Sequence, residues 1–165
     1  MALPRVIRNF NAFWDGISYF GLAELAKLTA VKIQTEAHRG AGMDGPVGQD
    51  VGMEAMSAEI TFTEWAPAVL VKLGRLERFV LRPAMSSATD FGAQPIIATL
   101  SGLITTSEPD DLKPGTPSKL KMTMDVRAYR LELDGVVMFD IDLVNARRVI
   151  GGTDQLAELR RAMGI

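Results

Sequence analysis

The chain has 165 residues, of which 47% are hydrophobic and 23% charged, and its 18 basic and 20 acidic side chains give a net charge of −2. These values are typical of one soluble folded domain. They exclude a disordered tail and a concentrated basic face for gripping nucleic acid. The absence of cysteine excludes disulfides, thiolate catalysis and cysteine metal sites.

The N-terminal residues 1–8 lack the apolar stretch of a signal peptide. No later stretch approaches the roughly 18 uncharged apolar residues of a membrane-spanning helix. We therefore expect a protein without a membrane anchor that is made and kept in the cytosol or released by lysis.

Asp15-Gly16 separates the aromatic-rich runs 11–14 and 17–20 and predicts a short hairpin, because this dipeptide favours the positive φ angles of a tight turn. The structure of residues 22–28 stays open, since the leucines have helical spacing. Residues 29–35 alternate as a strand does.

A glycine-rich segment follows at residues 39–52, and within it residues 40–45 read GAGMDG, which matches the G-x-G-x-x-G string of dinucleotide-binding proteins. Glu64 even lies about where an acid for the ribose is expected. However, a polar stretch precedes the glycines and no helical period follows them. The segment is therefore interpreted as a surface loop.

Residues 56–63 alternate strictly and predict a half-buried strand. Its inward-facing residues are Met56, Ala58, Ile60 and Phe62. Pro67 and Gly74 then bracket a short helix, in which Val69, Leu70 and Leu73 are expected to face the core.

The pattern continues with a strand over residues 75–82 that ends at Pro83, and a polar turn region over 85–94. Another strand is expected over 96–106. The proline- and acid-rich residues 108–117 predict a loop.

The long alternating run 120–133 leads to Asp134-Gly135 and returns over 136–143, which predicts a second and longer hairpin. A C-terminal helix is expected over 153–163, capped by Thr153, with leucine and methionine at helical spacing on one side. The fold class is therefore mostly β: a single domain, residues 1–165, forming an antiparallel β-sandwich or barrel-like subunit with a short internal helix and a C-terminal helix.

The candidate chemical motifs are weak. His38 is the only histidine, so no histidine pair for zinc exists. Asp140 and Asp142 share a strand face and could together bind calcium, but without further oxygen ligands we interpret them as a solvated face. We expect no catalytic, cofactor-binding or metal site. Four methionines at strand spacing indicate a core or a subunit interface: Met53, Met56, Met122 and Met124.

Several features suit an assembly subunit. Long alternating strands leave edges that need a partner, and the segments 39–52 and 108–117 are long for loops of a small β domain. Strands from several copies that join into one closed barrel would remove every edge.

From end to end and in the same order, the sequence resembles the major tail tube protein of P2-like contractile-tailed bacteriophages. The segments that carry the resemblance are 3–5, 13–16, 38–45, 129–135, 141–145, 152–156 and 163–165. The R-type pyocin tube subunit is similar to that family, and the type VI secretion tube protein shares its general architecture.

The resemblance implies a non-enzymatic subunit without cofactors, in hexameric rings that stack into a tube inside a contractile sheath. Tail sheath, baseplate and tail-terminator proteins are the implied partners. DNA would pass through the lumen, and the tube would be assembled in the host bacterial cytoplasm and belong to the virion tail. On this basis residues 39–52 form an inter-ring or inter-subunit contact. Its candidate residues are Arg39, Gly40, Gly42, Met43, Asp44 and Gly45.

A tube that conducts DNA needs polar walls that do not hold phosphate. The lumen-lining candidates are Glu59, Thr61, Thr63, Asp125, Asp140 and Asp142. Lys119, Lys121 and Arg127 lie on such faces too, so the sign of the lumen charge stays open. A monomeric or dimeric β-sandwich binding module is the alternative function, an enzyme is the least favoured, and a phage and a headless pyocin-like particle are not distinguished.

Overall fold

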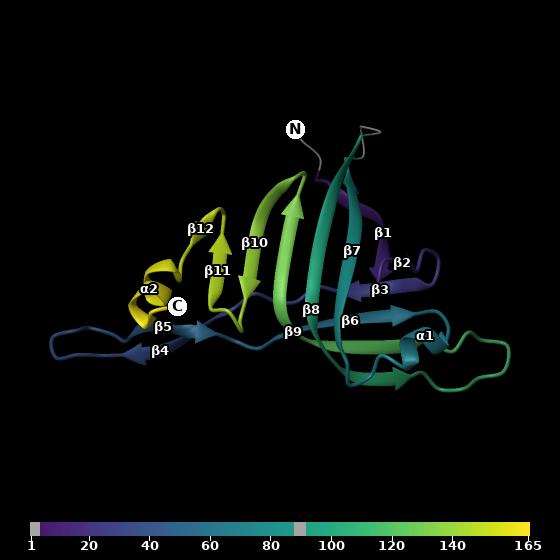
Figure 1. Cartoon of the computed structure of the whole chain (residues 1–165), viewed down its shortest axis with the longest axis horizontal. Coiled ribbons are helices and arrows are strands. Elements are labelled where there is room, and N and C mark those ends of the chain that lie inside the picture. Colours follow the sequence, from purple (N-terminus) through teal and green to yellow (C-terminus); the bar gives the residue numbers. More distant parts are fainter. Residues whose placement is uncertain (1–3, 88–91) are drawn as a thin grey trace.

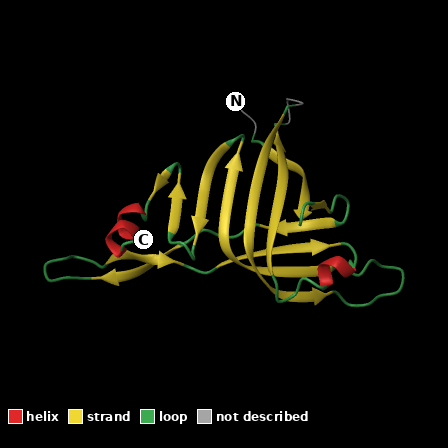
Figure 2. Ribbon diagram, viewed as in Figure 1, coloured by secondary structure: helices red, strands yellow, loops and turns green. Residues whose placement is uncertain are grey.

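The structure is a computed structural model that describes residues 4–87 and 92–165. Within them the protein is mostly β, with two short helices near opposite ends of the molecule (Figures 1 and 2). The strands are β1 (Val6–Trp14), β2 (Ile17–Ser18), β3 (Ala23–Lys27), β4 (Ile33–His38), β5 (Val47–Met53), β6 (Met56–Phe62), β7 (Leu76–Ser86), β8 (Ala93–Pro109), β9 (Leu120–Leu133), β10 (Val136–Asp142), β11 (Arg147–Ile150) and β12 (Thr153–Asp154). The helices are α1 (Pro67–Leu70) and α2 (Ala157–Met163).

One ten-stranded antiparallel sheet folds over on itself into two layers (Figure 1). In the upper layer the strand order is β12-β11-β10-β9-β8-β7-β1-β2. In the lower layer β3 pairs with β6, β6 pairs with residues 120–126 of β9, and those pair with residues 102–109 of β8. The expected sandwich is confirmed, and the single chain does not close into a barrel.

β8 and β9 belong to both layers because each strand bends where it passes from one to the other. The bend coincides with a β-bulge beside Ser101 and Gly102. A Cβ atom on Gly102 would lie 2.0 Å from the backbone oxygen of Asp125, so only glycine lets the two strands approach so closely.

The core lies between the layers and is rich in aromatic side chains. The rings of Trp14 and Phe79 meet edge to face with centroids 5.2 Å apart, and Trp14 stacks on Phe62 at 6.4 Å. Met56, Met122 and Met124 are buried in the same cluster, which makes them core residues; Met53 packs against it only in part. Each fully buried side chain of this size contributes roughly 1.5–3 kcal/mol. The inward face predicted for residues 56–62 is confirmed.

The hairpin at Asp15-Gly16 is confirmed, with Trp14 paired to Ile17. The open segment 22–28 contains strand β3, which pairs with β6. The strand expected over 29–35 is wrong for its first half, because 29–32 pair with no neighbouring strand and the ladder with β5 begins at Ile33.

The helix expected over 67–73 ends at Leu70; Val69 is buried, whereas Leu70 and Leu73 are exposed. The strand expected to end before Pro83 continues to Ser86. This is possible because the β7–β8 ladder has no paired residues between Leu81 and Ala84, so a proline there costs no bond to β8.

Three further boundaries differ from expectation. Within the expected loop 39–52, residues from Val47 onward form β5; the loop expected over 108–117 starts only after Pro109. The helix expected from Thr153 begins at Ala157 without a side-chain cap, because Thr153 pairs in β12 with β11. Leu3 and residues 88–91 of the expected turn region lie outside the described residues.

Candidate assembly surfaces

The outward side of the lower layer is a polar face carried by four strands. Its side chains alternate with buried ones and pair across the ladders, as Glu59 does with Thr123 and Thr61 with Lys121. We define the polar face by Leu25, Lys27, Ser57, Glu59, Thr61, Leu103, Thr106, Glu108, Lys121, Thr123 and Asp125.

Charges of both signs alternate on the polar face. Lys121 forms an ion pair with Glu108 at 2.9 Å, and the hydrogen bond to this carboxylate raises the pKa of Lys121. Lys27 lies opposite Glu59 in the register. The face is thus polar without a concentrated charge of either sign.

The polar face has two open edges. β3 forms one edge, and residues 105–109 of β8 form the other. Within the described part of the chain, no strand pairs with the outer side of either segment. Their free backbone groups are a template for pairing with another chain.

The structure brings three of the six lumen candidates, Glu59, Thr61 and Asp125, together on the polar face. Thr63 lies just beyond it, and its hydroxyl donates to the carbonyl of Leu22 at 3.2 Å.

Asp140 and Asp142 lie instead on β10 in the upper layer. Asp140 is paired with Arg147 at 2.8 Å and Arg130 at 3.4 Å. Burial raises the pKa of Asp142, but hydrogen bonds from Asn145 and Val144 outweigh it, so that the pKa is lowered. Both carboxylates therefore have local structural partners.

Residues 33–53 form a projecting hairpin, here called the arm (Figure 1). Within residues 4–87 and 92–165, β4 and β5 pair only with each other, and every residue of β4 is exposed. An isolated two-stranded hairpin is marginally stable in water, so the arm is a segment that gains from contact with another molecule.

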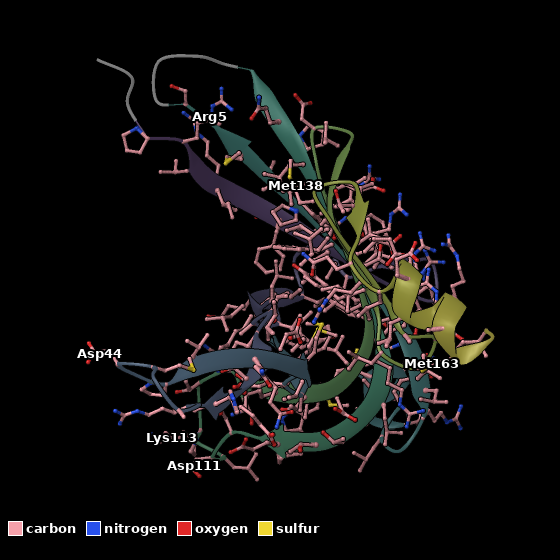
Figure 3. All side chains as sticks on the ribbon, turned by 90° about the vertical axis from the view of Figure 1, so that its left-hand side faces the viewer. Arg5, Asp44, Asp111, Lys113, Met138 and Met163 are labelled. Carbon is pink, nitrogen blue, oxygen red and sulfur yellow. The ribbon has the colours of Figure 1, made fainter. Side chains whose placement is uncertain are left out.

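The tip of the arm, residues 39–46, contains all six residues expected at the inter-subunit contact. Its turn is held by Met43, whose backbone N–H donates to the carbonyl of Gly40 at 3.2 Å and whose sulfur accepts from the Gly40 N–H at 3.1 Å. Gly42 has a φ of +85°, whereas Gly45 has no positive φ. Asp44 stands at the outermost point (Figure 3).

The base of the arm is tied to the body by one buried cation. Arg148 of β11 is 5% exposed and forms an ion pair with Asp50 of β5. This hydrogen-bonded partner lowers the pKa of Asp50. Sequence reasoning missed the pair because the two residues are far apart in the chain.

Large apolar side chains are exposed at both ends of the longest axis. At the arm end, α2 has no buried residue, so Leu159 and Met163 face solvent although their spacing is that of a core helix. At the other end, Trp65, Phe20 and Leu112 are exposed. Where such apolar side chains lie together, they form a candidate interaction surface.

Features of other function classes are weak in the described residues. No cluster of three or more His, Cys, Asp or Glu side chains that could hold a metal occurs among them. His38 is an exposed residue of β4, paired with Val47. The GAGMDG string lies at the tip of a hairpin and does not lead from a strand into a helix. Among the described residues no helix is long and apolar enough to span a membrane.

Comparison with known proteins agrees with an assembly role. The family model for phage tail tube protein FII matches residues 4–164. The tail tube protein of Escherichia phage P2 is 27% identical over the whole of both chains. The major tail tube protein of Serratia phage KSP20 is 26% identical over 88% of this chain and 86% of its own.

Among solved structures, the SPP1 Dit protein overlaps 74% of this chain and 52% of its own with 13% identity and a TM-score of 0.41, too weak an overlap to support an inference.

Proposed function

We propose that this protein forms hexameric rings, since the chain belongs to the phage tail tube protein FII family. Members of this family are structural components of a bacteriophage tail and not enzymes. The rings stack into the hollow inner tube of a contractile tail, and DNA passes through the lumen.

The polar face with its two open edges carries this proposal. If β3 of one copy pairs with residues 105–109 of β8 in the next, the lower layer continues from copy to copy. A ring of such copies closes into one barrel and leaves no free edge in the lower layer. The polar face then lines the lumen, and the hydrophobic core lies behind it.

The charge pattern of this lining suits passage of a polyanion. Lys121 is neutralised by Glu108, and Glu59 lies opposite Lys27. Strong binding of DNA needs a set of cations that replaces the counterions of successive phosphates. A wall with alternating charges does not supply such a set, so the DNA slides without being held.

The remaining partners follow from the same assembly. A sheath protein surrounds the rings, baseplate and tail-terminator proteins close the two ends, and the tube is assembled in the host bacterial cytoplasm. The outer side of the upper layer, which carries Arg130, Asp140 and Arg147, faces away from the lumen and is available to the sheath.

Electron microscopy of the purified protein at high concentration, alone and with a baseplate as nucleus, tests the proposal. We expect hollow tubes with six subunits per ring and a continuous barrel at the inner wall. Monomers that persist with the baseplate present, or rings of another number, would contradict it.

A single substitution tests the proposed pairing between the edges of neighbouring copies. Thr105 is the bulge residue of the β8 edge segment and has no partner in the register with β9, so Thr105→Pro alters this edge at a position where a proline is tolerated. We expect a monomer with unchanged circular dichroism that no longer forms rings.

A further inference from the structure

The tip of the arm and the loop at residues 110–119 lie at opposite ends of the longest axis of the molecule (Figure 1). Figure 3 looks along that axis, and there Asp44 on the tip and Asp111 and Lys113 on the loop all lie on the lower left side of the molecule. A second copy displaced along this axis therefore presents its loop on the side where the arm tip of the first copy projects.

The two segments also carry matching charges. Arg39 and Asp44 on the tip form no ion pair within the described residues, and neither do Asp111 and Lys113 on the loop. Each segment thus offers a cation and at least one anion that form no ion pair with another described residue of their own chain. Contact between copies can pair Arg39 with Asp111 and Asp44 with Lys113.

Apolar side chains accompany these charges. Leu112, between the two charged loop residues, is 76% exposed, and the indole of Trp65 donates to the Lys119 carbonyl at the base of the loop at 3.3 Å. On the arm, Val47 follows the tip and is 55% exposed. Docking buries these groups, for which the single chain provides no cover.

We propose that the tip of the arm docks onto the 110–119 loop of a second copy in the adjacent ring. This inference rests on the proposed function and names the surface that receives the arm. The contact is heterologous, since one end of a copy meets the other end of the next, and such contacts build open filaments. It therefore also gives every ring in the tube the same orientation.

Charge exchange tests the pairing. Asp44→Lys and Lys113→Asp should each raise the protein concentration needed for tube formation several-fold, and the double variant should return it close to the wild-type value. Glu158→Lys is the control, because it reverses an exposed charge on α2 that belongs to neither segment and should have little effect. Singles that assemble like wild type, or a double variant no better than the singles, would overturn the proposal.

Cross-linking tests the contact directly, since the chain has no cysteine. Ala41→Cys marks the tip, and Leu112→Cys marks the loop. In assembled tubes, a short bis-maleimide should join these two positions on different copies. The matched control replaces Leu112→Cys by Val144→Cys, which is 72% exposed near the arm end and should not cross-link to the tip.

The outcomes separate this inference from the proposed function. Tubes in which position 41 links to position 144, or to neither site, overturn the docking contact and leave the tube intact. Wild-type protein that never forms tubes overturns the proposed function, and the docking contact with it.

Discussion

Asp50 on the exposed arm is ion-paired with Arg148, which is buried on β11 between β10 and β12. Among the described residues this is the one ion pair between the arm and the rest of the chain. A second pair, Lys32 with Glu54 at 3.6 Å, joins the two residues that flank the arm at its base. The pair of Asp50 and Arg148 therefore fixes the direction in which the arm leaves the body.

Asp50→Asn should loosen the arm without unfolding the protein. The substitution leaves the buried guanidinium of Arg148 without its counterion, which costs more than the loss of an exposed pair. Hydrogen exchange followed by mass spectrometry should show faster exchange across the arm. Glu54→Gln, which breaks only the exposed pair with Lys32, is the control and should leave exchange unchanged. Equal exchange in both variants would contradict the anchoring role of Asp50.

Acidification should release the arm for the same reason. Arg148 lowers the pKa of Asp50 in the folded protein below the ordinary value of about 3.9. A carboxyl group with a depressed folded pKa contributes its stability above the unfolded pKa and loses it as the pH falls through the folded pKa. The rate of amide hydrogen exchange in the arm, after correction for the pH dependence of the exchange chemistry itself, should therefore stay constant from neutral pH to about pH 4. Below about pH 4 this rate should rise. In Asp50→Asn this rise should be absent.

Gly102→Ala should destabilise the fold strongly. A Cβ atom there would lie 2.0 Å from the carbonyl oxygen of Asp125, which belongs to the paired backbone of β9 and cannot move freely. Overpacking of this kind costs roughly 1–3 kcal/mol and occasionally more. Urea unfolding measures the loss, and Gly45→Ala, with no atom within 4 Å of the added Cβ, is expected to be neutral. A neutral Gly102→Ala would show that the bend relaxes.

Gly42→Val should weaken assembly while the monomer stays folded. Gly42 has a φ of +85°, a left-handed conformation that costs other residues about 1–2 kcal/mol. A Cβ atom at this position has no described atom within 4 Å, so the expected strain lies in the backbone of the tip. Gly45→Val is the matched control because Gly45 has no positive φ. Tube yield by sedimentation separates the two variants, and equal yields would dismiss the backbone argument.

Thr123→Lys should slow the passage of DNA through an otherwise normal tube. Thr123 lies within the polar face, between Glu59 and Thr106 in the register, so each copy adds a cation to the proposed lumen wall. Phosphate contacts weaken as salt rises, so DNA release measured with particles should be slow at low salt and recover at high salt. Thr153→Lys, at the exposed first residue of β12, adds the same charge elsewhere and should release DNA normally. Identical release would place the polar face away from the DNA.

The sequence predicted the strands whose partners are close in the chain or whose inward face is uniformly apolar. Asp15-Gly16 and Asp134-Gly135 both form the expected turns, because their positive φ angles are a local property. The alternation from Met56 to Phe62 correctly predicted a buried face, since the strand lies directly on the core.

The expectations from the sequence were wrong where contacts between residues far apart in the chain determine the structure. Pro83 fits inside β7 because the ladder with β8 is interrupted there, which local sequence does not reveal. Leu159 and Met163 have core spacing but lie on a helix with no buried residue, since the surface that would cover them belongs to no described part of the chain. The lumen-lining residues remain a prediction, and they fall on both layers: alternation identifies a polar face, but only the bend of β9 determines that Asp125 and Asp140 belong to different layers.

The two strands that pass through both layers also have a mechanical consequence. β8 and β9 are hydrogen-bonded to each other along nearly their whole length, from Pro109 and Leu120 to Ile96 and Leu133. A force applied lengthwise to this pair shears many backbone bonds at once, whereas a force that peels an edge strand breaks them one after another. In the proposed tube, an axial thrust on the upper layer would therefore be transmitted to the lower layer through the continuous backbone of β8 and β9.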